Sequence, residues 1–241
     1  PLDGQRYAFE GKVATMDPDR TVIERGVIYI HEGTITAVLP ESAPPPAGFE
    51  AAPVVHTGGT IFPGLIELHN HLSYNILPLW NVPKQFKRRD QWRNHKEKQK
   101  LVTGPMKMLG STPNYVEAIV RYVECKCLVS GVTTSQGLKL YGVGIDPYYK
   151  GIVRNVESPM VPGLPNALTR IADVEAKKHE NFIDRWNSTA CLLLHLCEGL
   201  DDKTRQHFEA LQFSDGSWAI NAQLAGIHCA ALTPEQFQIY G

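Results

Sequence analysis

Short apolar runs separated by turns occupy residues 1–60 and predict a small β module. Residues 12–16 read as one strand, which ends at an Asp-Pro-Asp turn. Residues 26–30 and 34–38 read as two further strands, and the glycine-containing turn between them predicts a hairpin. The first part of the chain is therefore expected to be all β.

The pattern changes after residue 60, where strand-like and helix-like segments alternate. Val116, Ile119, Val120 and Val123 follow the 3.6-residue period of a helix that packs one face on a core. Strands are expected at residues 65–69, 133–136, 152–156, 190–196 and 224–229, with a weaker candidate at 169–172, and helices at 114–128, 173–186, 202–212 and 234–240. Such alternation indicates an α/β fold with a mainly parallel sheet.

The number of strand candidates indicates an incomplete barrel. A (β/α)8 TIM-like barrel needs roughly 250 residues, whereas residues 61–241 supply about six strand candidates. We therefore predict a β module at residues 1–60 and a partial barrel at residues 61–241. Residues 75–113 form a long insertion after the first barrel strand, and long loops at the catalytic face of a barrel are typical of lids or substrate walls.

Composition narrows the range of partners. Of the 241 residues, 43% are hydrophobic and 20% are charged, which is an ordinary globular composition. The formal net charge of −1 argues against nucleic acid as a partner, although the insertion itself is basic and aromatic. No apolar run approaches the roughly 20 residues of a membrane span, and the chain does not open with a secretory leader. We expect a small-molecule substrate and no membrane contact, and we leave a homo-oligomer open.

The cysteines favour a reducing compartment. They are Cys125, Cys127, Cys191, Cys197 and Cys229. Their number is odd and no Cys-x-x-Cys pair occurs, so no disulfide framework is expected. Reduced thiols in apolar segments are typical of cytoplasmic proteins.

Two histidines separated by one residue end the apolar run at residues 64–71. Because strand side chains alternate between two faces, His69 and His71 are expected on the same face of the strand's end. Such a pair can hold one divalent metal ion. Chance His-x-His pairs are common, so the interpretation depends on further ligands elsewhere in the chain.

Further polar residues fall at the ends of later strand candidates. His195 lies within the apolar run at residues 190–196, where an imidazole is costly unless it is ligated or hydrogen-bonded. Glu198 follows three residues later, and His228 ends the run at residues 224–228. Active sites of (β/α)8 barrels lie at the carboxyl ends of the strands. These three residues are therefore expected to share one site with the histidine pair.

At these positions the chain resembles the amidohydrolase superfamily. The matching stretches are residues 61–71, 194–199 and 226–228, in the order and spacing of that family. The β module is also similar to the family's composite β-sandwich, so the resemblance implies a small β-sandwich module ahead of the TIM-like barrel. The match is strongest with the single-metal branch, which includes cytosine deaminase and chlorohydrolases. Residues 71–84 are also similar to a subgroup that acts on carbamate- and urea-like compounds.

The resemblance implies a role for each site residue. His69, His71 and His195 correspond to metal ligands, and the ion implied is one divalent metal, with zinc favoured over iron, manganese or cobalt. Glu198 corresponds to a proton shuttle between water and leaving group. His228 corresponds to a residue that orients or deprotonates the water.

The two-metal branches of the family offer an alternative arrangement. In them His228 would be a direct ligand, and a carboxylated lysine would bridge the metals. Lys139 is the one lysine in a strand-end apolar setting, and it is a weak candidate for that role.

Three further polar residues end strand candidates, namely Gln136, Arg154 and Asn155. Their side chains would either face the substrate or pack against neighbouring residues.

The implied function is a metal-dependent hydrolase of EC 3.5 type. A metal-bound hydroxide would attack a deaminase-, amide-, carbamate- or urea-type substrate, and Glu198 would protonate the departing nitrogen. The family's last site residue is an aspartate after the eighth strand, and Asp201 and Asp215 come too early to fill that position. We therefore expect a fragment, or part of a longer enzyme, with low activity by itself. The alternative is a non-catalytic amidohydrolase-like scaffold.

Overall fold

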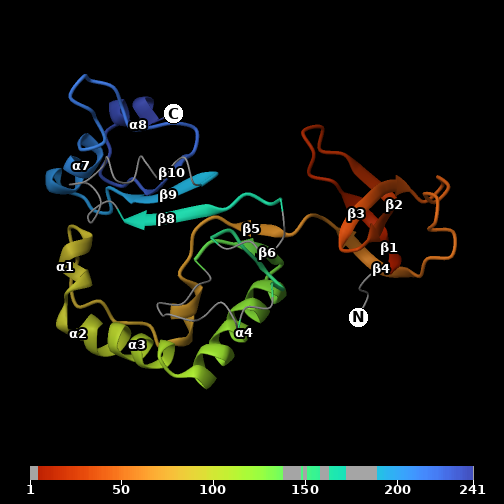
Figure 1. Ribbon diagram of the computed structural model, residues 1–241, viewed down its shortest axis with the longest axis horizontal. Helices are drawn as coiled ribbons and strands as arrows, with labels where there is room; N and C mark the ends of the chain where they lie inside the picture. The colour runs from red at the N-terminus through yellow and green to blue at the C-terminus, as the bar shows by residue number, and fades with distance from the viewer. Residues whose placement is uncertain (1–4, 138–147, 149–150, 158–162, 172–188, 241) are drawn as a thin grey trace. The chain divides into compact units, whose positions relative to one another are not determined.

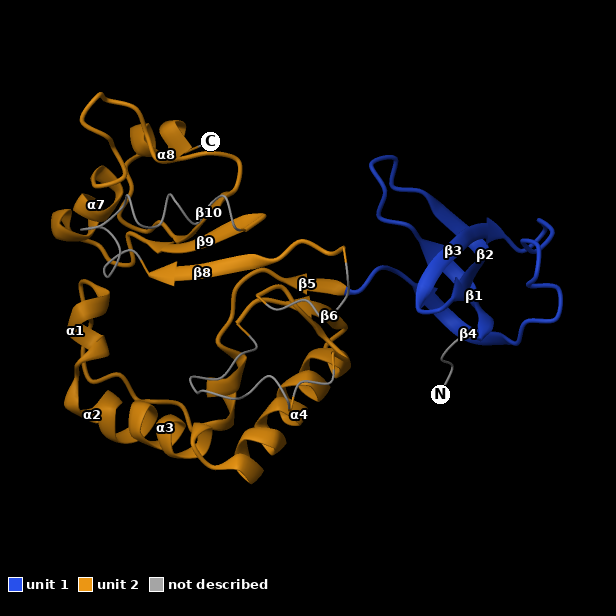
Figure 2. Cartoon of the chain, in the orientation of Figure 1, with its two compact units in different colours: residues 1–64 blue, residues 65–241 orange. Residues whose placement is uncertain are grey.

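A computed structural model describes residues 5–137, 148, 151–157, 163–171 and 189–240. The chain separates into two compact units, Pro1–Gly64 and Leu65–Gly241, which are described one at a time (Figure 2). The helix expected at residues 173–186 lies outside the described residues. Within the described part, none of the helices combines the length and the apolar character that a membrane crossing requires.

The first unit contains a four-stranded sheet in the order β3-β2-β1-β4 (Figure 1). Its strands are β1 (Arg6–Ala14), β2 (Val22–His31), β3 (Thr34–Pro40) and β4 (Val54–Ile61). β2 pairs antiparallel with β1 and β3, whereas β4 pairs parallel with β1. The strand expected at residues 12–16 is the end of β1, which stops at Ala14 before Met16 takes a φ of 58°.

The predicted hairpin is formed by β2 and β3. Glu32 and Gly33 connect the strands with φ values of 51° and 71°, and positive φ at both central positions gives the twist that a tight hairpin requires. Glycine adopts that conformation without strain. The buried cluster of this unit consists of Ala8, Val27, Tyr29 and Phe49.

The second unit contains parallel strands with helices between them, and the α/β class is confirmed. Its strands are β5 (Leu65–Glu67), β6 (Val132–Ser135), β7 (Arg154–Asn155), β8 (Ala167–Ile171), β9 (Cys191–Leu196) and β10 (Leu224–His228). They form two parallel sheets, β5-β6-β7 and β8-β9-β10. The amide of Ala167 donates to the carbonyl of Val156 over 2.7 Å, which brings the start of β8 beside the end of β7. Neighbouring strands therefore follow the order of the sequence.

Two strands are markedly shorter than predicted. The strand expected at residues 152–156 is reduced to β7, because the amides of Ile152 and Val153 donate to the buried carboxylate of Glu124 over 2.9 and 3.2 Å. The strand expected at residues 65–69 ends at Glu67.

The helices pack apolar residues against these strands. They include α4 (Pro113–Val129), α7 (Asp202–Glu209) and α8 (Pro234–Tyr240), close to the predicted ranges. α4 buries the four residues that the helical period had indicated. Leu192, Leu194 and Leu196 of β9 are fully buried together with Phe208 of α7. The carboxyl end of β9 is therefore held by a well-packed core.

The insertion at residues 75–113 is mainly helical in its second half. It begins within η1 (Leu72–Ile76) and contains α1 (Arg89–Arg93), α2 (Lys96–Lys98), a π-helical turn η2 (Gln99–Thr103) and α3 (Gly104–Gly110). Backbone hydrogen bonds join its Lys87–Arg89 segment to the loop after β9: Arg89 donates to Glu198 over 3.2 Å, and Leu200 donates to Lys87 over 2.7 Å. The start of α1 is thereby fixed beside that loop.

Candidate metal centre

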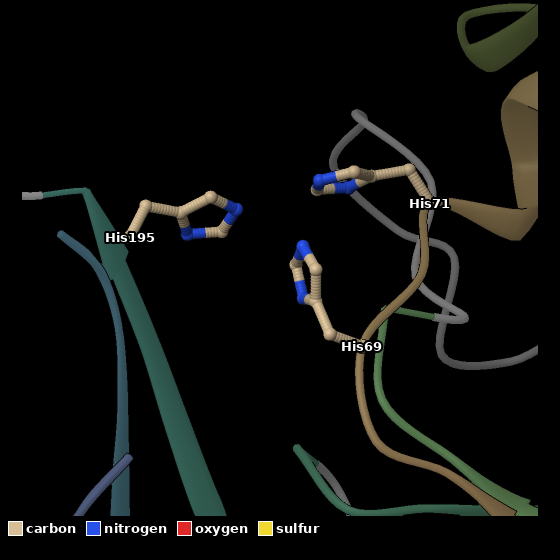
Figure 3. A group of neighbouring side chains, drawn as sticks. All are labelled: His69, His71 and His195. Atoms are coloured by element: carbon tan, nitrogen blue, oxygen red, sulfur yellow. The ribbon is translucent and has the colours of Figure 1, made fainter. Parts of the chain in front are cut away.

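The three predicted metal ligands converge. Nitrogen atoms of His69, His71 and His195 lie within 4.8 Å of one another. Figure 3 shows the rings of His69 and His71 pointing toward the ring of His195, which approaches from the opposite side. His195 lies near the end of β9, as predicted.

The backbone that positions the histidine pair differs from the predicted strand. Because β5 ends at Glu67, His69 and His71 lie in the bend beyond the strand, and the expectation that strand alternation places them on one face is wrong. The bend is shaped locally, since the side chain of Asn70 accepts the amide hydrogen of His71 over 2.7 Å.

Gly137 limits the position of that bend from the other side. It is buried with a φ of 75°, and a Cβ atom built there would lie 1.7 Å from the carbonyl oxygen of Asn70. Only glycine permits this approach of two backbones. The segment between the two histidines therefore rests directly on the chain that follows β6.

A polar network determines which nitrogen of His69 faces the site. Gln136 is 2% exposed, and its Nε2 donates to Glu157 over 3.1 Å and to Thr169 over 3.0 Å. Its Oε1 therefore faces His69 Nδ1, at 2.5 Å. Because an amide oxygen only accepts, Nδ1 carries the hydrogen and Nε2 keeps the lone pair that a metal requires.

The other two histidines are also suited to metal binding. Nδ1 of His195 donates to the carbonyl of Arg170 over 2.9 Å, which leaves Nε2 as the acceptor. Burial lowers the pKa of His195 to about 4, and burial followed by the nearby His69 lowers the pKa of His71. Neutral imidazoles bind divalent metals, so the chemistry of this donor set fits one such ion with coordination positions left open.

Glu198 and His228 lie at the same end of the strands. The ring of His228 is 5.9 Å from that of His69 and 5.6 Å from that of His195. Its Nε2 lies 4.0 Å from Oε2 of Glu198, so these two predicted residues face each other at the edge of the histidine cluster. Burial, then His69 and Arg89, lowers the pKa of His228.

Arg89 is a site residue that the sequence patterns did not indicate. Its Nε lies 3.1 Å from the carboxylate of Glu198, and both side chains are largely buried. Its position in a long basic insertion, 109 residues from its partner by number (198 − 89), gave no signal of this contact. The insertion therefore contributes a charge to the site.

Other candidates have different roles. Asp201 caps the first turn of α7 through the amide of Thr204 and pairs with Arg88 over 2.7 Å, which agrees with its exclusion as a metal ligand. Arg154 donates to the carbonyl of Pro165 over 2.9 Å, and Asn155 is buried. Lys139 lies outside the described residues.

The fold is similar to that of solved hydrolases. A triazine hydrolase variant matches with a TM-score of 0.70 at 17% identity, over 98% of this chain and 63% of that one. An atrazine chlorohydrolase from Arthrobacter aurescens in complex with zinc matches with a TM-score of 0.61 at 16% identity, over 98% and 64%. This chain therefore spans slightly less than two thirds of the length of those proteins.

A curated relative supports the same resemblance. Over 66 residues the chain is 42% identical to a 5-methylthioadenosine/S-adenosylhomocysteine deaminase from Nitratidesulfovibrio vulgaris. The aligned stretch covers 27% of this chain and 15% of the deaminase. No family model matches the chain. The solved structures show that the fold is similar to that of these hydrolases, and the deaminase shares a similar stretch of 66 residues.

Proposed function

We propose that this chain carries the metal-binding part of a hydrolase that acts on carbon–nitrogen bonds other than peptide bonds. The observation that carries the proposal is the convergence of three imidazoles within 4.8 Å, two of which already use Nδ1 in hydrogen bonds. The likeness in fold to a triazine hydrolase supports the same class of chemistry.

The architecture belongs to the same proposal. β5 to β10 would be consecutive strands of a (β/α)8 barrel, because their order in space follows the sequence. Residues 1–60 would contribute to a composite β-sandwich, residues 61–241 to the barrel, and the insertion at residues 75–113 would act as a lid.

His69, His71 and His195 would hold one divalent ion, with zinc favoured over iron, manganese or cobalt. When bound, such an ion supplies an activated water, since zinc lowers the pKa of bound water to about 7, and it polarises the oxygen of the substrate. The hydrogen bonds of His69 and His195 fix their ring orientation before any ion arrives.

Glu198 and His228 would take part in proton transfer. The carboxylate of Glu198 would take a proton from the attacking water and deliver it to the departing nitrogen. His228 faces the same carboxylate and would orient the water through its ring nitrogen. The substrate would be a small molecule, and the five free thiols favour action in the cytoplasm.

Metal analysis of the complete protein tests the proposal first. We expect about one divalent ion per chain by plasma mass spectrometry. His69→Ala should lose the ion, whereas His31→Ala, at the end of β2, should retain it. If the purified protein neither contains nor takes up zinc, iron, manganese or cobalt, the hydrolase proposal is wrong.

A substrate panel tests the chemistry next. Amides, carbamates, ureas and amino-heterocycles are screened for release of ammonia or amine. Glu198→Gln should retain the ion and lose at least about 100-fold in turnover, because a general acid–base residue contributes that much or more. Metal binding without turnover of any member would favour the non-catalytic scaffold.

A further inference from the structure

A short β-bridge fixes the loop after β9 to the insertion. Arg88 and Gly199 are its paired residues, and they lie between the two backbone hydrogen bonds that join residues 87–89 to residues 198–200. A Cβ atom built on Gly199 would lie 2.6 Å from the carbonyl oxygen of Lys87, so the two backbones touch where a side chain would not fit. The position of this loop therefore depends on the insertion.

The side chain of Glu198 is held from the same part of the insertion. Its Oε2 is buried and lies 3.1 Å from Nε of Arg89. The guanidinium of Arg89 lies over the ring of Trp92, with 5.6 Å between Cζ and the ring centroid, which is an attractive cation–π contact. Arg89 and Trp92 lie one turn apart on α1 and are therefore neighbours on its surface. The helix thus presents an already oriented cation to the carboxylate.

A proton shuttle works only when its carboxylate is held in place. Proton transfer needs a heavy-atom separation of about 2.6–3.2 Å, and a displacement of about 1 Å can slow a reaction about 100-fold. A glutamate side chain rotates about several bonds, so an unrestrained carboxylate occupies many positions. Because Nε2 of His228 lies 4.0 Å from the same Oε2, the placement of this atom by Arg89 also sets its separation from His228.

We propose that Arg89 is a positioning residue for Glu198 and that the ring of Trp92 supports it. The inference rests on the proposed function, since the placement of Glu198 affects turnover only if the protein is a hydrolase. Arg89 makes and breaks no bond of the substrate. It acts by holding the carboxylate at the edge of the histidine cluster, so its loss should release Glu198 and leave the three histidines in place.

Coupling between the two side chains is measured first, on the metal-free complete protein and without substrate. Denaturant midpoints are compared for the wild type, Arg89→Gln, Glu198→Gln and the double variant. Arg89→Gln should lower the midpoint in the wild-type background and lower it clearly less beside Glu198→Gln, because the partner charge is then already gone. Equal losses in the two backgrounds would refute the proposal, whether or not the protein is a hydrolase.

Turnover of a substrate from the panel by the metal-loaded protein tests the catalytic consequence. Arg89→Gln should keep the metal and an unchanged KM, and it should lower kcat about 10- to 100-fold. Beside Glu198→Gln it should cause no further loss, because it acts through that carboxylate. Arg121→Gln is the matched control: it removes an exposed arginine of α4 from its pair with Glu117 and should keep the wild-type kcat.

Restoring the missing group separates positioning from general damage to the fold. Arg89→Ala should recover part of its kcat when guanidinium chloride is added at a millimolar concentration, whereas sodium chloride at equal ionic strength should have no such effect. Trp92→Phe keeps a ring face for the cation and should retain more turnover than Trp92→Leu. Identical losses in the two Trp92 variants would remove the ring from the proposal, and a lack of guanidinium rescue would count against Arg89.

The two proposals fail in different ways. Coupling between Arg89 and Glu198 in a protein that turns over no member of the panel would support the fixed carboxylate and count against the hydrolase. Turnover in which Arg89→Gln raises KM and leaves kcat unchanged would assign Arg89 to substrate binding and overturn the positioning role. Additive losses of kcat in the double variant would overturn it as well, and both results would leave the hydrolase proposal standing.

Discussion

Replacing Gln136 by methionine should weaken zinc binding without changing any of the three ligands. Methionine has a similar length but cannot accept the hydrogen of His69 Nδ1, which lies 2.5 Å from the amide oxygen. Without that acceptor the ring of His69 is free to rotate and to place its hydrogen on Nε2, the nitrogen that faces the site. Loss of such a supporting hydrogen bond lowers metal affinity about 10- to 100-fold, or about 1.4–2.7 kcal/mol.

The hydrogen bonds around Gln136 also predict how much the Gln136→Met substitution lowers the free energy of unfolding. Glu157 loses the donor at 3.1 Å but keeps the hydroxyl of Thr169 at 2.6 Å, so it is not left without a partner. The free energy of unfolding should therefore fall by about 1–3 kcal/mol, the cost of one disrupted buried hydrogen-bonding group. A loss of this size leaves a folded protein whose metal affinity can be measured.

Competition with a chromophoric zinc chelator measures the affinity of each variant. Gln223→Met is the matched control. The partly buried amide of Gln223 precedes β10 and makes only a weak hydrogen bond, to the carbonyl of Thr189 over 3.4 Å. NMR of the ¹⁵N-labelled imidazoles reports the tautomer of His69 in the metal-free chain. If Gln136→Met binds zinc within about twofold of the wild type, the argument that this amide orients His69 is wrong.

Three further measurements test other parts of the structure. Asp201→Ala removes the cap of α7 and should lower the free energy of unfolding by about 1 kcal/mol in a denaturant titration; an unchanged midpoint would contradict the cap. The pKa of His195 is lowered from 6.5 to about 4 in the folded chain, so the unfolded chain takes up a proton at a higher pH than the folded chain does. The free energy of unfolding of the metal-free protein should therefore fall by up to about 3 kcal/mol as the pH falls from 6.5 to 4. This loss should be smaller in His195→Gln. Burial raises the pKa of Cys197 to about 12 while Cys125 is exposed, so a thiol reagent at pH 8 should label Cys125 well before Cys197; equal rates would contradict this burial.

The sequence predicted best those elements whose pattern is purely local. The period of Val116, Ile119, Val120 and Val123 placed α4 within one residue of its ends, and the residues 234–240 coincide with α8. In both cases the apolar spacing and a proline in the first turn specify the helix without help from the rest of the chain.

Strand ends were predicted less well because they depend on partners elsewhere. An apolar run at residues 65–69 does not reveal that pairing stops at Glu67, since the stop depends on where β6 begins and ends. The same holds at residues 152–156, where a carboxylate from α4 takes the hydrogen bonds that a neighbouring strand would have made.

The candidate metal ligands were identified by residue type and order, whereas their supporting partners were not. Several imidazoles that follow apolar runs, taken together, can be recognised from one sequence. Gln136 and Arg89 are ordinary polar residues whose importance comes only from a contact with a distant residue, His69 or Glu198. A single sequence without the fold carries no signal of such contacts.

The close approach at Gly137 has a consequence for anyone who wishes to redesign this protein. A methyl group at that position would displace the carbonyl of Asn70 and, with it, both histidines of the bend, although it would touch neither of them. A cavity beside His195 and Glu198 is lined by Arg93 of α1 and Lys203 of α7, which lie on other elements. A library that varies those two positions and keeps residue 137 as glycine would test new ligands for the cavity while leaving the histidines of the candidate metal centre in place.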